Sequence, residues 1–254
     1  MEESALPACA FTGFRVLAQR PLMLLTWWLG VLTLSALAFS GALLIGRPDR
    51  AGGFVVHMLG PIGIPVIVAS ATVLICAVFR QILRPEHRLI GLRFGADELR
   101  LAPVLLVLGI VMAAGMSPLL LAGRPRLAAT AALLLVGPFF CLIAPAIFAI
   151  RRLDPRPGWR LVKERYFDLL GMNLLIWGVY ATASVLFGQM WRWLILLNDD
   201  GLNRAVRAGT AGVAWPAGIA VVLAVLIYGA LLVIIAAPSA EAYRRLTSPP
   251  APGP

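Results

Sequence analysis

Six long apolar runs dominate this chain and restrict what it can fold into. They cover residues 22–45, 54–79, 101–122, 127–150, 167–188 and 212–237. A helix needs about 20 apolar residues to cross the hydrocarbon core of a bilayer. Because backbone groups in lipid must be hydrogen-bonded within their own segment, we expect each run to be helical. The sequence therefore predicts an all-α polytopic membrane protein with six transmembrane helices.

The chain is too apolar to cover itself with a water-exposed surface. Its 254 residues are 60% hydrophobic and 13% charged, whereas a soluble domain carries about 25% charged residues. The formal net charge is +10, and the basic residues lie in short connections between the apolar runs. Charge placed there is typical of topology control and of contact with anionic lipid head groups. We therefore expect membrane lipids as partners and no nucleic acid.

The positions of Lys and Arg predict which side of the membrane each connection faces. Fifteen of the 22 basic residues fall near the N-terminus, near residues 80–100 and 151–165, and in the C-terminal tail. The other seven fall in the alternate connections. Since cytoplasmic loops carry an excess of Lys and Arg, we expect both termini in the cytoplasm. The predicted location is the bacterial inner membrane, with a multi-pass topology.

One pattern occurs three times: a basic amphipathic segment, an apolar run, and a second run interrupted by proline. Its cue residues are Arg15, Arg93 and Arg160, in FRVLAQRPLMLL, LRFGADELRLA and WRLVKERYFDLL. Repetition of this kind predicts three related helical hairpins, at about residues 10–80, 86–150 and 155–240. We expect a single domain over residues 1–245 and a disordered tail over residues 246–254.

Each cue arginine lies in a segment that has one apolar face. In the third copy, Asp154 as N-cap and Pro155 at the first position predict the start of a helix. The three apolar faces are formed by Phe11, Phe14 and Leu17, by Leu89, Leu92, Ala96 and Leu99, and by Trp159, Val162, Tyr166 and Leu169. We expect amphipathic helices that lie in the membrane interface with the apolar side down. Arg15, Arg93 and Arg160 are then the candidate contacts for anionic head groups. Solvated charged loops are the alternative.

Prolines interrupt the second run of each hairpin. They are Pro61 and Pro65, then Pro138 and Pro145, then Pro216. Proline removes a backbone donor and clashes with the preceding turn, so these helices are expected to kink or unwind. Such breaks at corresponding positions of repeats are typical of transporter sites. In membrane helices they more often merely set packing angles.

Few polar side chains lie within the apolar runs. Asn173, Tyr180 and Ser184 fall roughly on one face of the fifth run, and they are a candidate intramembrane polar face. Polar groups of this kind bond neighbouring helices more often than they hold a substrate. The absence of charged residues near the centre of any run argues against ion-coupled transport.

Nothing in the sequence identifies a catalytic, cofactor-binding or metal-binding residue. Glu86, His87, Asp97 and Glu98 lie close together, and a salt-bridged polar face is the simplest interpretation of them. The three cysteines are far apart and have neither disulfide-framework nor zinc-type spacing. We therefore expect no enzyme activity and no cofactor.

The third amphipathic segment carries a resemblance to known proteins. WRLVK (residues 159–163), running into YFDLL (residues 166–170), is similar to a segment of the YciC-like family of bacterial inner-membrane proteins. It also resembles the membrane domain attached to some glycerophosphodiester phosphodiesterases. Residues 83–101 look like a segment of hypothetical alphaproteobacterial membrane proteins. The resemblance implies a multi-pass envelope protein. It implies no catalytic residue, because the phosphodiesterase chemistry belongs to a separate soluble domain.

These features favour a non-enzymatic integral membrane protein of the bacterial envelope. Its role is expected to be that of an accessory or scaffold subunit in a membrane protein complex, or one in lipid handling. The alternative is a transporter of a small solute or lipid that uses the Pro-broken helices as gates.

Overall fold

The computed structural model describes residues 5–45, 68–84, 92–121, 137–179, 181–182, 185–186, 188–189 and 214–248. The described residues are helical and contain no strand, so the all-α prediction is confirmed for this part of the chain. The labelled helices are α1 (Ala5–Cys9), α2 (Thr12–Gln19), α3 (Pro21–Ile45), α5 (Ala96–Leu121), α7 (Gly137–Ile150), α8 (Arg156–Glu164) and α10 (Ala214–Thr247). Two further helices cover Val68–Leu83 and Tyr166–Val179.

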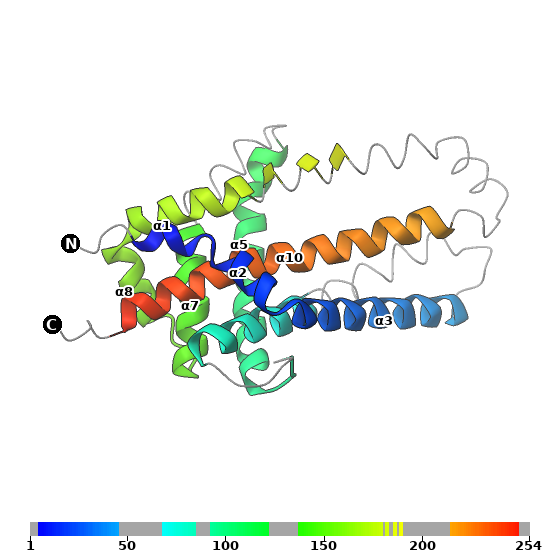
Figure 1. Cartoon of the computed structure of the whole chain (residues 1–254), viewed down its shortest axis with the longest axis horizontal. Helices are drawn as coiled ribbons and strands as arrows, with labels where there is room; N and C mark the ends of the chain where they lie inside the picture. The colour runs from blue at the N-terminus through cyan, green and yellow to red at the C-terminus, as the bar shows by residue number, and fades with distance from the viewer. Residues whose placement is uncertain are drawn as a thin grey trace.

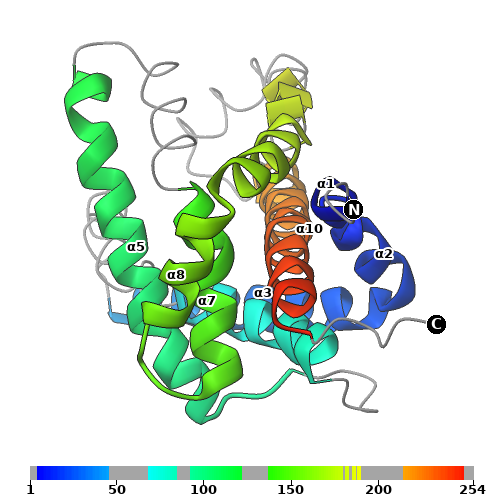
Figure 2. The same ribbon diagram turned by 90° about the vertical axis from the view of Figure 1, so that its left-hand side faces the viewer.

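The long helices do not all run in one direction. Figure 1 shows α3 and α10 side by side along the long axis of the molecule, whereas α5 runs across that axis. In Figure 2, which looks along α10, the helices α2 and α8 lie on opposite sides of it. Helix α1 packs against α10, near the C-terminal end of that helix (Figure 1).

One helical stretch among the described residues, Val225–Thr247, is long and apolar enough to cross a membrane. More than half of it is buried in the protein, as the core helix of a soluble protein also is. Thr12–Gln19 and Pro21–Leu34 meet the same criterion only as a pair, and they are bent by 83°. Val68–Leu83, Cys141–Ile150 and Tyr166–Val179 are apolar but shorter. The six-span layout and its three hairpins stay a prediction.

The core is built around the contact between α7 and α10, which both contribute to two clusters of buried side chains. The first cluster joins these helices to α3 and the Val68–Leu83 helix, and includes an edge-to-face pair of Phe79 and Phe148. The second joins them to α1, α8 and the Tyr166–Val179 helix. Trp27 and Trp28 of α3 donate their indole N–H groups to the carbonyls of Ser70 and Val222. The ring of Trp27 is buried and that of Trp28 partly buried, and neither leaves its donor unsatisfied.

Two of the predicted amphipathic segments, α2 and α8, are short helices that break directly before an apolar helix. The breaks fall at Arg20 (φ −134°, ψ 54°) and Arg165 (φ −129°, ψ 30°), which have similar backbone conformations. In each case the N–H group still donates to the carbonyl four residues earlier, at 2.9 Å and 3.1 Å. Each arginine follows its cue residue, Arg15 or Arg160, by five positions. The predicted amphipathic segments are therefore helical at these two places.

The smallest side chains of these two helices face other helices of the protein. Gly13 and Val16 of α2, and Gly158 and Val162 of α8, are buried. A Cβ atom at Gly13 would lie 2.5 Å from the Cα atom of Ile234, and one at Gly158 would lie 2.8 Å from the carbonyl oxygen of Leu142. Both helices therefore approach the backbone of α10 or α7 at a distance that only glycine permits.

The predicted apolar face of the third segment is partly buried and partly exposed. On the third segment Val162 and Leu169 are fully buried, while Trp159 is 43% exposed. On the second segment residues 92–94 are not helical, and α5 begins at Ala96; Leu89 lies outside the described residues. Helix α8 also begins at Arg156 and not at Pro155, although Asp154 accepts a hydrogen bond from the Arg156 N–H at 3.0 Å.

Pro145 does not unwind the helix in which it lies. It is in the interior of α7, which is helical from Gly137 to Ile150. Pro138 and Pro216 lie in α7 and α10 close to residues outside the described part of the chain, so the breaks expected there stay predictions. Pro238, which the sequence reading passed over, lies inside α10. Pro61 and Pro65 lie outside the described residues.

The two close glycine contacts predict large effects of one added methyl group. We expect Gly13→Ala and Gly158→Ala each to lower the free energy of unfolding by about 1–3 kcal/mol, because the neighbouring backbone must move. Chemical unfolding in detergent would measure this. Gly171→Ala is the matched control, since nothing lies within 4 Å of its Cβ position, and it should be neutral or stabilising by up to about 1 kcal/mol. Equal stability of all three variants would show that the close contacts do not form.

Candidate functional site

The first candidate head-group contact, Arg15, is exposed on α2 between aromatic side chains that are also exposed. Phe11 is 61% exposed and Phe14 is 42% exposed. The opposite face of α2 is held against α10 by Gly13 and Val16. One short helix therefore presents a cation and two aromatic rings outward while its small residues anchor it to the protein.

The second candidate, Arg160, lies on α8 in a similar setting. Its side chain is 85% exposed, and its Nε atom donates to the Glu164 carboxylate at 3.1 Å. An exposed ion pair at this spacing contributes only a few tenths of a kcal/mol, so it constrains the arginine little. Trp159 is 43% exposed, and the Lys163 Nζ atom lies 5.9 Å from the centre of its ring. The face again combines basic and aromatic groups.

The third candidate, Arg93, precedes α5 in a non-helical segment and is exposed, as is its neighbour Phe94 at 66%. The three arginines do not converge on one pocket. They belong to three different segments, and α2 and α8 lie on opposite sides of α10 (Figure 2). The arrangement can offer separate contact points around the bundle, and not a single binding site for one head group.

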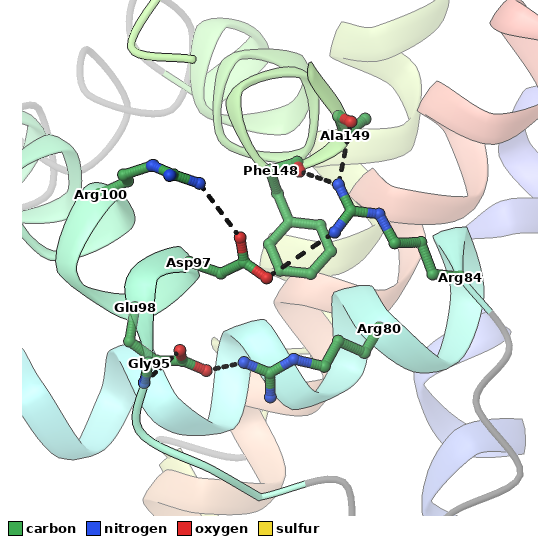
Figure 3. A network of polar contacts seen from close by, with 8 residues as sticks. All are labelled: Arg80, Arg84, Gly95, Asp97, Glu98, Arg100, Phe148 and Ala149. Carbon is green, nitrogen blue, oxygen red and sulfur yellow. Dashed lines mark hydrogen bonds and ion pairs between the residues drawn. The ribbon is translucent and has the colours of Figure 1, made fainter. Parts of the chain in front are cut away.

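A buried polar network, which the sequence reading missed, joins the Val68–Leu83 helix to the start of α5 (Figure 3). Arg80 forms an ion pair with Glu98, and both side chains are at least 98% buried. The other carboxylate oxygen of Glu98 accepts the Gly95 N–H at 2.9 Å. This bond caps the first turn of α5, as the acidic residue of a capping box does. Glu98 thus fixes both the start of α5 and its position beside the neighbouring helix.

Arg84 extends this network to α7. Its Nη2 atom donates to the carbonyls of Phe148 and Ala149 at 2.8 Å and 3.0 Å, and its guanidinium lies 4.9 Å from the Phe148 ring centre. Carbonyls in the last turn of a helix lack intrahelical partners, and a cation is favourable there. Asp97 lies 3.7 Å from Arg84 and 3.5 Å from Arg100 (Figure 3).

These contacts confirm that Asp97 and Glu98 form salt bridges, but the position of Glu98 differs from the predicted one. Glu98 is buried between helices and does not lie on a solvated face. Its partner is 18 positions away along the chain, beyond the spacing that a helix-face pattern can detect. Glu86 and His87 lie outside the described residues.

A mostly apolar cavity of about 210 Å³ lies among five helices: Val68–Leu83, α5, α7, Tyr166–Val179 and α10. The described residues that line it carry no charge. One of them is Asn173, from the polar face that was predicted; Tyr180 and Ser184 lie outside the described residues. Ser239 also lines the cavity, and its hydroxyl donates to the Ala236 carbonyl at 2.7 Å.

Asn173 is 95% buried, and only one of its two amide atoms forms a hydrogen bond. Its Oδ1 atom accepts a hydrogen bond from the Cys141 thiol at 3.2 Å. Within the described part of the chain, its Nδ2 atom has no hydrogen-bond partner. This atom lies against Gly137, where a Cβ atom would collide with it. A buried donor left without a partner costs about 1–3 kcal/mol.

Burial raises the pKa of the Cys9 thiol, so it is protonated at neutral pH and is not an activated nucleophile. Among the described residues, no three His, Cys, Asp or Glu side chains come together as metal ligands would.

No protein-family model, curated protein or solved structure matches this chain.

The buried ion pair predicts a strongly non-additive response to mutation. Arg80→Met or Glu98→Leu alone should lower the free energy of unfolding by about 3–5 kcal/mol, because each leaves a buried charge without its partner. The double variant should recover most of that loss, short by about 1 kcal/mol for the cap at Gly95. Unfolding in detergent would measure the cycle.

The exposed pair of Arg160 and Glu164 provides the matched control. Arg160→Gln should change the free energy of unfolding by less than about 1 kcal/mol. Additive losses at Arg80 and Glu98 would show that the two side chains are not paired in the folded protein.

Proposed function

We propose that this protein is a non-enzymatic, multi-pass membrane protein that holds anionic lipids through α2, α8 and the segment before α5. It serves as an accessory or scaffold subunit of the bacterial inner membrane, or in lipid handling. The observation that carries the proposal is the shared construction of α2 and α8. Each has a close-packed inner face of Gly and Val and an outer face of Arg with exposed aromatic rings.

This outer face has the chemistry of a membrane boundary. Phe14 beside Arg15, and Trp159 beside Arg160, place an aromatic ring and a cation next to each other in an exposed position. Aromatic rings favour the head-group level of a bilayer, and basic side chains favour anionic lipids there. Because α2 and α8 lie on opposite sides of α10, the contacts would surround the bundle as a basic collar.

The same proposal includes the six-span layout with both termini in the cytoplasm. The antiparallel course of α3 and α10 and the contact of α1 with α10 support it, because they put the first and last described segments at one end (Figure 1). The six-span layout must also accommodate α5, which runs across this axis.

Cysteine labelling from each side of the membrane would test the layout. We expect a membrane-impermeant maleimide added to intact spheroplasts to label cysteines introduced at Arg47, Arg124 and Arg204. Cysteines introduced at Arg88 and Arg152 should react only after the membrane is opened. Labelling of Arg124→Cys from the cytoplasmic side alone would contradict two of the six spans.

Removal of the three cue charges would test the collar. We expect Arg15→Gln, Arg93→Gln and Arg160→Gln together to weaken retention of anionic lipid, by about 1 kcal/mol for each contact. Native mass spectrometry of the protein with added phosphatidylglycerol would measure the loss. Phosphatidylcholine retention should stay unchanged.

The matched control carries the same charge change in the connections predicted on the other side, as Arg47→Gln, Arg126→Gln and Arg207→Gln. If both triple variants lose phosphatidylglycerol equally, the effect is one of net charge and the collar is not the site. If neither loses it, the head-group proposal fails.

The transporter alternative rests on the prolines, and Pro145 lies within a continuous α7.

A further inference from the structure

We propose that the cavity beside Asn173 binds an uncharged hydrocarbon chain that carries one carbonyl group, and that this ligand is the acyl ester of a membrane lipid. The site is distinct from the head-group contacts of α2 and α8, and the proposal does not depend on them. It rests on the shape, lining and unused hydrogen-bonding capacity of the cavity.

The lining selects an apolar and uncharged ligand. Its walls are formed mainly by aliphatic and aromatic side chains, including Ile75, Phe79, Ile176 and Leu232. The described lining residues carry no charge that could pair with a phosphate, a carboxylate or an ammonium group. A charged head group would therefore stay outside, because burying an unpaired charge is strongly unfavourable.

The size of the cavity indicates that it can hold one segment of a hydrocarbon chain. Its volume of about 210 Å³ exceeds the ~150 Å³ of an apolar protein cavity that binds benzene, and it is smaller than a whole lipid requires. Among its described lining residues, Ile235 of α10 is 42% exposed, whereas Cys141 and Ala236 are buried. A chain that lies along α10 can insert one segment there.

Asn173 determines which polar group the ligand must carry. Its Oδ1 atom is engaged by the Cys141 thiol, so the unused group at Nδ2 is a donor and calls for an acceptor. Gly137, against which Nδ2 lies, also lines the cavity, so the donor lies at the cavity wall. The acceptor must be uncharged, and a carbonyl oxygen is the uncharged acceptor that a hydrocarbon chain carries as an ester.

The experiment uses the full chain in nanodiscs with two photoreactive phosphatidylcholines that have a diazirine in one acyl chain. One has ester-linked chains and the other has ether-linked chains, which lack the carbonyl. Cross-linked peptides are then located by mass spectrometry. We expect the ester probe to label cavity residues such as Ile75 and Ile176 about fivefold more than the ether probe, as one neutral hydrogen bond would give. Labelling of the exposed Leu174 and Leu175 should be equal for both probes and serves as the internal control.

Asn173→Leu, which keeps the size of the side chain, should abolish the preference for the ester while the surface labelling stays unchanged. Gly137→Ala displaces the same amide and should act alike if the first variant does not fold. Equal cavity labelling by both probes in the natural protein would overturn the carbonyl contact. Labelling confined to the surface would overturn the site. Displacement of the probe by a quinone but not by unlabelled ester lipid would overturn the acyl-ester assignment. Since phosphatidylcholine has no net charge, none of these outcomes depends on the basic collar.

Discussion

The contact between α7 and α10 is the constraint on which the other packing depends. These helices supply residues to both buried clusters, and each receives one amphipathic helix at a glycine. Gly158 sets α8 on α7, and Gly13 sets α2 on α10. Because the approach is made backbone to backbone, dispersion contacts act over a short distance and leave no void to fill. The exposed aromatic rings of α2 and α8 are outward because their smallest residues are inward.

Polar contacts complete this packing at the ends of the helices. Arg84 binds carbonyls in the last turn of α7, and Glu98 binds the N–H of Gly95, directly before α5, as well as Arg80. Arg80 and Arg84 come from neighbouring turns at the end of the Val68–Leu83 helix. Arg80 contacts α5, and Arg84 contacts α7. The network therefore sets the relative position of three helices by bonds to their ends, where backbone groups lack intrahelical partners. The apolar cavity lies among the same three helices, together with α10 and the Tyr166–Val179 helix.

Local features of this fold could be predicted from the sequence, and long-range ones could not. The 3.6-residue periodicity predicted α2 and α8, and the apolar runs predicted helices where α3, α7 and α10 occur. The burial of Arg80 could not be predicted, because a basic residue at the end of an apolar run has the same pattern whether it faces water or a carboxylate. Proline was read as a break, but Pro145 lies inside a continuous α7.

The candidate site shows the same division. Exposure of Arg15 and Arg160 agrees with the amphipathic pattern, since a charge opposite an apolar face points outward. Asn173 was singled out as a polar residue in an apolar run, but its unused donor depends on the positions of Cys141 and Gly137 on another helix. The sequence alone contains no signal for that geometry.

The contact of Gly13 with Ile234 also has a consequence for the order of assembly. The two residues are 221 positions apart, so α2 leaves the ribosome long before the surface that it covers exists. At about 5–20 residues per second, the interval is on the order of 10–40 s. During that time the surface of α10 that covers Gly13 has not yet been made. The contact of α2 with α10 can therefore form only near the end of synthesis.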